Sequence, residues 1–262
     1  MEKLKATLSS IKQGQYPALM THVVLGYPTL EKSIEIALAM ADSGAAIIEL
    51  QIPFSDPMAD GPTIMKASEC ALAQGVRPKD CMLAMEKISS KTQVPVLFMS
   101  YFNLVFSAGV KQFCKDSAAA GAQGLIVPDL PPEDSTEGYW EAAAENKLAA
   151  IALVSPVTTK HRFELIKKRA KDGFVYCVST TGTTGARNNL PENIKLYLDL
   201  VKNEINLPRA LGFGISSKEQ ISSLIGNAEI AIVGSAMIDK IDKSKDLIKE
   251  VRSYTKELSG NE

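Results

Sequence analysis

The sequence predicts an α/β protein whose eight parallel strands, each followed by a helix, close into a (β/α)8 barrel, the TIM-barrel architecture. Short apolar runs alternate along the chain with longer stretches of helical period, which is typical of repeated strand–helix units. There are eight such runs, and 262 residues is a usual length for one barrel. An open doubly wound sheet is the lesser alternative. No linker-like stretch divides the chain, so we expect a single domain over residues 1–262.

The strands are assigned to the apolar runs, and the helices to the periodic stretches between them. The strands are expected at residues 19–25, 46–52, 96–100, 124–127, 149–154, 174–178, 210–213 and 230–233. The helices are expected at residues 29–43, 61–74, 79–89, 110–120, 133–146, 159–171, 191–203, 217–225 and 243–258. An extra N-terminal helix over residues 2–12 and a short phosphate-binding helix after strand eight complete the prediction.

Two kinds of signal mark the ends of these helices. Ser216 and Glu219 have the spacing of a capping box, which predicts the start of the helix over 217–225. Glycine also follows five helices, where a residue that tolerates positive φ ends the helix and turns toward the next strand. These glycines are Gly44, Gly75, Gly121, Gly173 and Gly226.

Composition excludes several classes of function. The net charge of −1 provides no field that would attract nucleic acid or an acidic membrane. No window approaches the roughly 18 uninterrupted apolar residues that a spanning helix needs, and the N-terminus lacks the apolar core of a secretion signal. We therefore expect a cytoplasmic protein with neither nucleic-acid nor membrane partners.

The cysteines and histidines indicate neither a metal site nor a disulfide framework. The four cysteines are scattered without paired spacing, and the two histidines do not cluster with them. We interpret the cysteines as small hydrophobic residues in helices and in one strand. They are Cys70, Cys81, Cys114 and Cys177.

One apolar strand carries a carboxylate, which is unusual. Glu49 lies within the run over 46–52 and shares a strand face with Ile47 and Gln51. The opposite face is wholly apolar and suits the layer beneath the helices, so Glu49 is expected to point into the barrel. Burial there penalises its charged form, as suits a group that gives and takes protons near neutral pH. The alternative is a structural glutamate satisfied by backbone amides.

Asp60 is the second candidate catalytic residue. It lies in a loop rich in proline and glycine just past the same strand, and in a barrel the ends of the strands carry the chemistry. Ala-Asp-Gly-Pro is equally good turn chemistry, in which the aspartate binds its own backbone. The residues alone leave both interpretations open.

Glycine-rich turns after the last two strands predict a phosphate site. Leu211 to Ser216 and Val233 to Ile238 each bring glycine to the end of a strand. Glycine allows close approach of an anion, and free amides at a helix start favour negative charge. Either motif alone also has a purely steric explanation, but their joint placement favours phosphate. The polar loop from Ser179 to Arg187 is interpreted as a lid, with a plain connector as the alternative.

These motifs resemble the α subunit of tryptophan synthase essentially from end to end. The run from Pro53 to Pro62 is the most specific match. The other matching segments are Leu25 to Pro28, Glu49 to Ile52, Tyr101 with Asn103 to Phe106, Val127 to Asp129, Thr180 to Arg187, Gly212 to Ile215 and Gly234 to Ala236. The resemblance implies a (β/α)8 barrel that cleaves indole-3-glycerol phosphate to indole and glyceraldehyde 3-phosphate by a retro-aldol step.

The resemblance also implies a role for each matching residue. Glu49 would be the general acid and base, and Asp60 would bind the indole nitrogen. Phosphate would be held by the amides of Gly185, Gly214, Gly234 and Ser235. Indole would be flanked by Tyr101, Phe213 and Ile232, and the two acids would be supported by Tyr176 and Thr184. The β subunit, which carries pyridoxal phosphate, would dock on Pro53, Phe54, Asp56 and Pro57 in an α2β2 complex, while this subunit would need no cofactor or metal. A rigid loop that only positions Asp60 is the alternative.

Three residues depart from the family pattern. Gln51 stands where glycine is usual, and is expected either to hydrogen-bond to Glu49 or to narrow the pocket. His22 stands where an apolar aromatic residue commonly borders the indole site, either as a polar wall or as a satisfied core histidine. Thr180 replaces an arginine of some relatives. These departures affect ligand preference and basal rate, not reaction class.

Three functions compete on this sequence. The leading hypothesis is a lyase that works as half of a two-subunit complex. A free-standing lyase that releases indole is the second, and a binding module that regulates a partner without turnover is the third. Intact Glu49 and Asp60 argue against the last.

Overall fold

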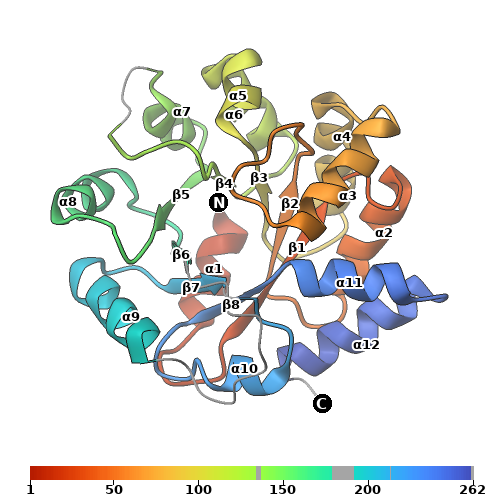
Figure 1. The fold of residues 1–262 in the computed structure, drawn as a ribbon. Coiled ribbons are helices and arrows are strands. Elements are labelled where there is room, and N and C mark those ends of the chain that lie inside the picture. Colours follow the sequence, from red (N-terminus) through yellow and green to blue (C-terminus); the bar gives the residue numbers. More distant parts are fainter. Residues whose placement is uncertain (134–136, 179–191, 213, 261–262) are drawn as a thin grey trace.

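The computed structural model describes residues 1–133, 137–178, 192–212 and 214–260, and within them the chain forms a closed barrel of eight parallel strands (Figure 1). Each strand pairs with the next along the chain, and the eighth pairs with the first. The strands are β1 (Ala18–Val24), β2 (Ile47–Gln51), β3 (Val96–Met99), β4 (Gly124–Ile126), β5 (Ala149–Val154), β6 (Val175–Val178), β7 (Arg209–Gly212) and β8 (Ile230–Val233). All eight expected strands are confirmed.

Helices surround the barrel in the view of Figure 1, except the N-terminal helix, which lies behind its centre. They are α1 (Glu2–Ser10), α2 (Leu30–Ala41), α3 (Pro62–Ala73), α4 (Pro78–Ser89), α5 (Phe102–Ser107), α6 (Val110–Ala119), α7 (Tyr139–Glu145), α8 (Lys160–Arg169), α9 (Glu192–Glu204), α10 (Lys218–Ser222), α11 (Ser235–Lys243) and α12 (Leu247–Ser259). The extra N-terminal helix is confirmed as α1, whose fully buried Leu4 packs in the inner core of the barrel. The short helix after strand eight is α11.

Three helix predictions need correction. The predicted capping box is not formed: the N-cap is Ser217, whose Oγ accepts a hydrogen bond from Gln220 N, while Gln220 Oε1 accepts one from N of Ser216, the residue before the cap. The helix expected over 133–146 begins only at Tyr139 in the described residues, after Gly138 with a φ of 65°. Helix α5 was not predicted. It has only 6 residues, too few for a periodic signal.

The two faces of β2 belong to different layers, as strand alternation predicts. Ile48, Leu50 and Ile52 pack in the large core between strands and helices. Ile47 packs in the inner core, so Glu49 on the same face points into the barrel. The five glycines expected to end helices all have positive φ. No helix in the described part of the chain is long and apolar enough to span a bilayer.

Gly124 shows how closely the strands pack. A Cβ placed on Gly124 would lie 2.6 Å from the carbonyl oxygen of Ala149, its partner on β5. We expect Gly124→Ala to lower the free energy of unfolding by about 1–3 kcal/mol, because an overpacked site must shift its backbone. Denaturant unfolding followed by the fluorescence of the single tryptophan, Trp140, measures this. Gly61→Ala is the control, since a Cβ there meets nothing within 4 Å; equal losses in both variants would contradict the steric explanation.

Candidate functional site

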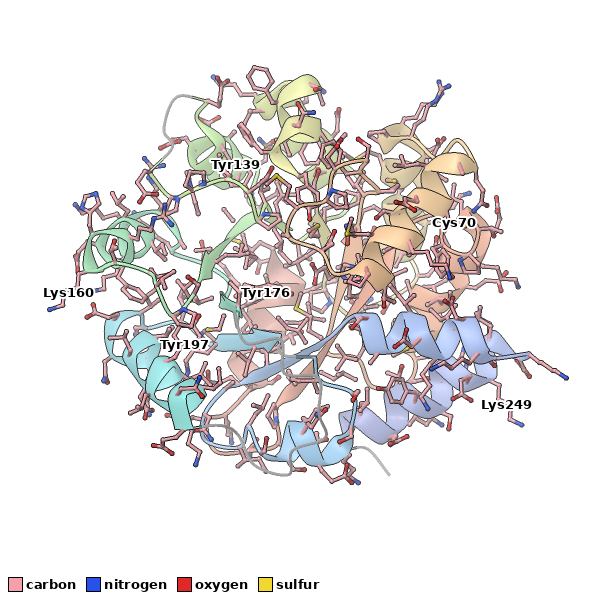
Figure 2. The ribbon with its side chains drawn as sticks, viewed as in Figure 1. Cys70, Tyr139, Lys160, Tyr176, Tyr197 and Lys249 are labelled. Carbon is pink, nitrogen blue, oxygen red and sulfur yellow. The ribbon has the colours of Figure 1, made fainter. Side chains whose placement is uncertain are left out.

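A cavity of about 450 Å³ opens at the carboxyl ends of the strands, where the sequence places the candidate residues. Several strands and the loops that follow them contribute to its wall. The lining residues are His22, Glu49, Ala59, Asp60, Gly61, Ile64, Met99, Ile126, Pro128, Leu153, Tyr176, Val178, Gly212, Gly214, Ile215, Ile232, Gly234 and Ser235. Tyr176 is labelled in Figure 2, close to the centre of the barrel. Both candidate acids and three candidate phosphate ligands therefore face one space.

Glu49 is brought to the cavity by β2 and is only 2% exposed. Its Oε1 lies 3.5 Å from Nδ1 of His22, the residue beside it on β1. Its Oε2 is buried and has no hydrogen-bond partner among the described residues. A buried carboxylate oxygen without a partner is costly, so Oε2 is the atom available to a ligand.

Asp60 reaches the same cavity from the loop after β2. Its Oδ2 accepts a hydrogen bond of 2.6 Å from Nε2 of Gln51. The carboxylate is thus held by a strand side chain, which favours a functional role over the turn interpretation. Burial raises the pKa of Asp60 above its ordinary value, although His22, Gln51 and Tyr101 act in the opposite direction.

His22 and Gln51 join the two acids into a polar group, here called the acid cluster: His22, Glu49, Gln51 and Asp60. Burial lowers the pKa of His22, but the nearby Glu49 carboxylate, with Asp60 and Gln51, outweighs burial and raises the pKa above its ordinary value. Nε2 of His22 and Oε1 of Gln51 are buried without hydrogen-bond partners in the described structure. Of the two alternatives expected for Gln51, the bond to Glu49 is not formed, because Gln51 donates to Asp60, and Gln51 is not among the residues that line the cavity.

Three of the predicted phosphate ligands, Gly214, Gly234 and Ser235, line the cavity after β7 and β8. Gly214 follows β7 with a φ of 58°, a conformation that favours glycine. Gly234 is the N-cap of α11 and Ser235 is its first residue. The first amides of a helix have no partner within it and carry the positive end of the dipole, so these groups offer hydrogen bonds to an anion.

The other predicted substrate residues fall into three groups. Tyr176 and Ile232 line the cavity, and burial raises the pKa of the Tyr176 hydroxyl well above its ordinary value. Tyr101 is 1% exposed and lies behind the loop, where its hydroxyl accepts a hydrogen bond from Ala59 N at 3.0 Å. The remaining residues, Thr184, Gly185 and Phe213, lie outside the described residues, as does the predicted lid.

The predicted docking loop packs against Tyr101. The Phe54 ring stacks on the Tyr101 ring with centroids 5.3 Å apart. Pro53 and Pro57 are buried, whereas Asp56 is exposed. The loop therefore has an anchored underside and an exposed outer edge that carries both Asp56 and the apolar Met58.

Sequence reasoning missed part of the apolar wall. Met99, Ile126 and Leu153 line the cavity from β3, β4 and β5. Each is an inward-facing residue near the end of its strand, so alternation along these strands is the signal that would have found them.

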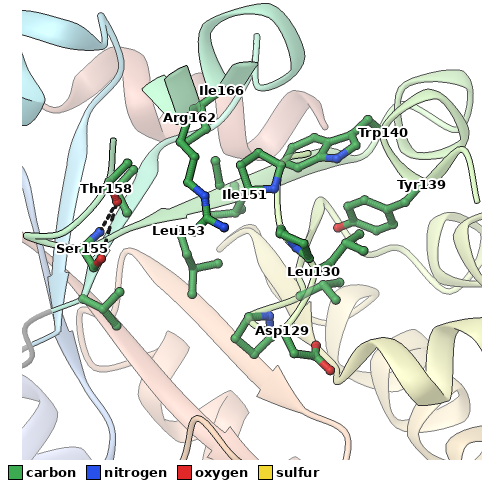
Figure 3. Close-up of a pocket in the computed structure, with 17 residues that line it drawn as sticks. Asp129, Leu130, Tyr139, Trp140, Ile151, Leu153, Ser155, Thr158, Arg162 and Ile166 are labelled. Atoms are coloured by element: carbon green, nitrogen blue, oxygen red, sulfur yellow. Dashed lines mark hydrogen bonds between the residues drawn. The ribbon is translucent and has the colours of Figure 1, made fainter. Parts of the chain in front are cut away.

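A second cavity of about 350 Å³ lies beside β4 and β5 and is drawn in Figure 3. Its charged side chains are already engaged, since Arg162 Nε donates to Glu133 Oε1 at 2.6 Å and the Asp129 carboxylate accepts from Phe102 N. The described residues hold no group of three side chains suited to a metal ion. The barrel mouth is therefore the stronger candidate for the active site.

Comparison with known proteins agrees with this geometry. The family model for the tryptophan synthase alpha chain matches residues 8–261. The tryptophan synthase alpha chain of Desulfotalea psychrophila is 42% identical over 241 residues, covering 92% of this chain and 94% of the relative. That of a Thermoanaerobacter species is 40% identical over 261 residues, covering 98% of both chains.

Solved structures agree as well. A chain in a structure of Mycobacterium tuberculosis tryptophan synthase superposes with a TM-score of 0.89 at 35% identity, covering 98% of this chain and 96% of that one. Tryptophan synthase subunit alpha from Legionella pneumophila gives a TM-score of 0.91 at 30% identity, covering 99% and 98%. The chain described here therefore belongs to the tryptophan synthase alpha chain family.

Proposed function

We propose that the cavity at the barrel mouth is the site of cleavage, with Glu49 as the general acid and base and Asp60 as the residue that binds the indole nitrogen. As a tryptophan synthase alpha chain, the protein is a lyase of tryptophan biosynthesis that converts indole-3-glycerol phosphate into indole and glyceraldehyde 3-phosphate. The observation that carries our assignment is that the two acids and the phosphate-side amides line one cavity.

The reaction requires three separate interactions. Carbon three of the indole ring must gain a proton, the ring nitrogen must be stabilised as positive charge develops on it, and the glycerol hydroxyl next to the breaking bond must lose its proton as a carbonyl forms. Two carboxylates in different surroundings can divide such tasks. Glu49, buried and with Oε2 free, suits proton transfer. Asp60, fixed by Gln51, suits a steady negative charge beside the nitrogen.

The phosphate tail fixes the substrate across the cavity. The amides of Gly214, Gly234 and Ser235 would bind its oxygens, since backbone amides at a helix start are well suited to anions. We assign Gly185 to the same set by family resemblance. Ile232 and Tyr176 supply an apolar wall for the ring, with Tyr101 holding the loop behind Asp60 and Phe213 and Thr184 assigned by resemblance.

The proton transfers at this site need no cofactor, and we propose that the subunit works without one or a metal. The partner is the tryptophan synthase β subunit, to which we assign pyridoxal phosphate chemistry in an α2β2 complex. We propose that Pro53, Phe54, Asp56 and Pro57 form its docking loop. The exposed carboxylate of Asp56 and the side chain of Met58, which is 93% exposed, are available on the outer edge for that contact.

Indole release from indole-3-glycerol phosphate tests the proposal. We expect release by the isolated chain, and faster release when a β subunit is present. Equal rates with and without the β subunit would indicate a free-standing lyase. No release in either condition, with substrate still bound, would contradict the proposal and leave a binding module.

A further inference from the structure

Gln51 is an unusual residue for the inside of a barrel. Its side chain is fully buried on the inward face of β2, beside Met99 of β3 in the strand register. Nε2 donates to Oδ2 of Asp60 at 2.6 Å, whereas Oε1 has no partner among the described residues. A buried amide with one unsatisfied oxygen is costly, so packing alone does not explain it.

The bond joins a rigid element to a loop. Gln51 is the last residue of β2, whose position is fixed by pairing with β1 and β3. Asp60 lies nine residues later, in a loop whose two preceding residues, Met58 and Ala59, are exposed. The Tyr101 hydroxyl also interacts with the Asp60 carboxylate, but the Gln51 amide is the group that ties this carboxylate directly to a strand.

We propose that Gln51 is a positioning residue, whose amide holds the Asp60 carboxylate over the cavity and in its charged form before substrate binds. The proposal rests on the role of Asp60 stated above. It adds that the orientation and charge of Asp60 depend on a strand residue that need not touch substrate.

The surroundings of Asp60 decide the direction of the expected effect. His22 from β1, Glu49 from β2, Tyr101 after β3 and Tyr176 from β6 all interact electrostatically with Asp60. Burial raises the pKa of Asp60, and the Gln51 amide is among the interactions that lower it.

Loss of the amide should therefore raise the pKa of Asp60 further. If Asp60 acts as a carboxylate, activity falls as pH falls through that pKa. Removal of Gln51 then moves the acid limb of the pH–rate profile to higher pH.

The test uses two variants in complex with a β subunit. Gln51→Met keeps approximate shape and removes the amide, whereas Gln51→Glu places a second carboxylate beside Asp60. We expect Gln51→Met to shift the acid limb of kcat/KM upward by about one pH unit, which corresponds to a tenfold change in proton affinity. Gln51→Glu should shift it further, because like charges disfavour ionisation.

Ile47→Val is the matched control. Ile47 lies one layer below Glu49 on the same inward face and lies outside the cavity wall. The Ile47→Val variant should lose some stability and keep the acid limb of the wild-type pH–rate profile. Thermal unfolding of every variant verifies the fold, and if Gln51→Met does not fold, Gln51→Glu still tests the direction of the shift.

The outcomes separate the two proposals. An unshifted acid limb in folded Gln51→Met or Gln51→Glu, with Asp60→Asn inactive, would overturn the positioning role and leave the function intact. Wild-type activity in Asp60→Asn would instead overturn the role assigned to Asp60, and the positioning role with it. An upward shift in both Gln51 variants, absent from Ile47→Val, supports the inference.

Discussion

Replacement of Glu49 by glutamine is expected to leave the barrel folded and to slow cleavage by about 10²–10⁴-fold, the usual contribution of one general acid or base. Glutamine keeps nearly the same shape beside His22 but exchanges no proton with substrate at neutral pH. The measurement is steady-state indole release in the presence of a β subunit, with substrate affinity determined separately. We expect kcat to fall while binding is largely kept.

The size of this effect follows from the position of Glu49. Glu49 lines the cavity, is 2% exposed and has an Oε2 without a hydrogen-bond partner among the described residues, so bulk water cannot readily replace it as a proton carrier. Glu35→Gln provides a matched control, because Glu35 lies on α2 in an exposed pair with Lys32. A Glu49→Gln variant that keeps more than a tenth of the wild-type rate would contradict our assignment of the general acid and base.

The strands and the inward direction of Glu49 could be predicted because both depend on local sequence. Alternation along β2 separates Ile48 and Leu50 from Glu49 and Gln51 without knowledge of any other element. The same argument applies to the helix-ending glycines, whose positive φ is a local property.

Features that depend on long-range contacts could not be predicted. Helix α5 begins where Phe102 N donates to the Asp129 carboxylate, 27 positions away in the sequence. Asp129 stands out in the sequence as a polar residue after strand four, but nothing local indicates that it caps a helix after strand three.

The partner of Gln51 is a similar case. Alternation places Gln51 beside Glu49 on one strand face, which made a hydrogen bond to Glu49 one of the two roles expected for Gln51. The course of the loop from Pro53 to Asp60 returns the Asp60 carboxylate to the barrel instead. The hydrogen-bond partner of Gln51 therefore depends on loop geometry. This partner determines which residues of the acid cluster are bonded to one another.

Replacement of Glu229 by glutamine is expected to lower the free energy of unfolding by about 3–5 kcal/mol, because it leaves a buried charge without its partner. The side chain of Arg209, at the start of β7, is 2% exposed. Its Nη2 and Nε donate to the two carboxylate oxygens of Glu229 at 2.6 and 3.1 Å, and Nη1 donates to the Leu198 carbonyl. A bidentate pair of this kind balances the two charges and also holds the two side chains in one geometry.

The effect should be confined to stability. Arg209 begins β7, whereas the catalytic cavity lies at the opposite, carboxyl end of the strands, so the folded variant should keep its activity per molecule. Denaturant unfolding of Glu229→Gln, of Arg209→Met and of the double variant gives the coupling energy directly. We expect the double variant to recover part of the loss, since it carries neither charge of the pair and leaves no buried charge unpaired.

Glu35→Gln again serves as the control, because both members of its pair with Lys32 are 50% exposed and surface pairs contribute only about 0–1 kcal/mol. If Glu229→Gln lowers the free energy of unfolding by no more than Glu35→Gln does, the buried charge of Arg209 must be satisfied by the Leu198 carbonyl and its surroundings alone. The pair would then be dispensable for closing β7 onto β8, although Glu229 N also donates to Arg209 O across that junction. A loss of the expected size would instead identify this ion pair as a main support of the end of the barrel opposite the site.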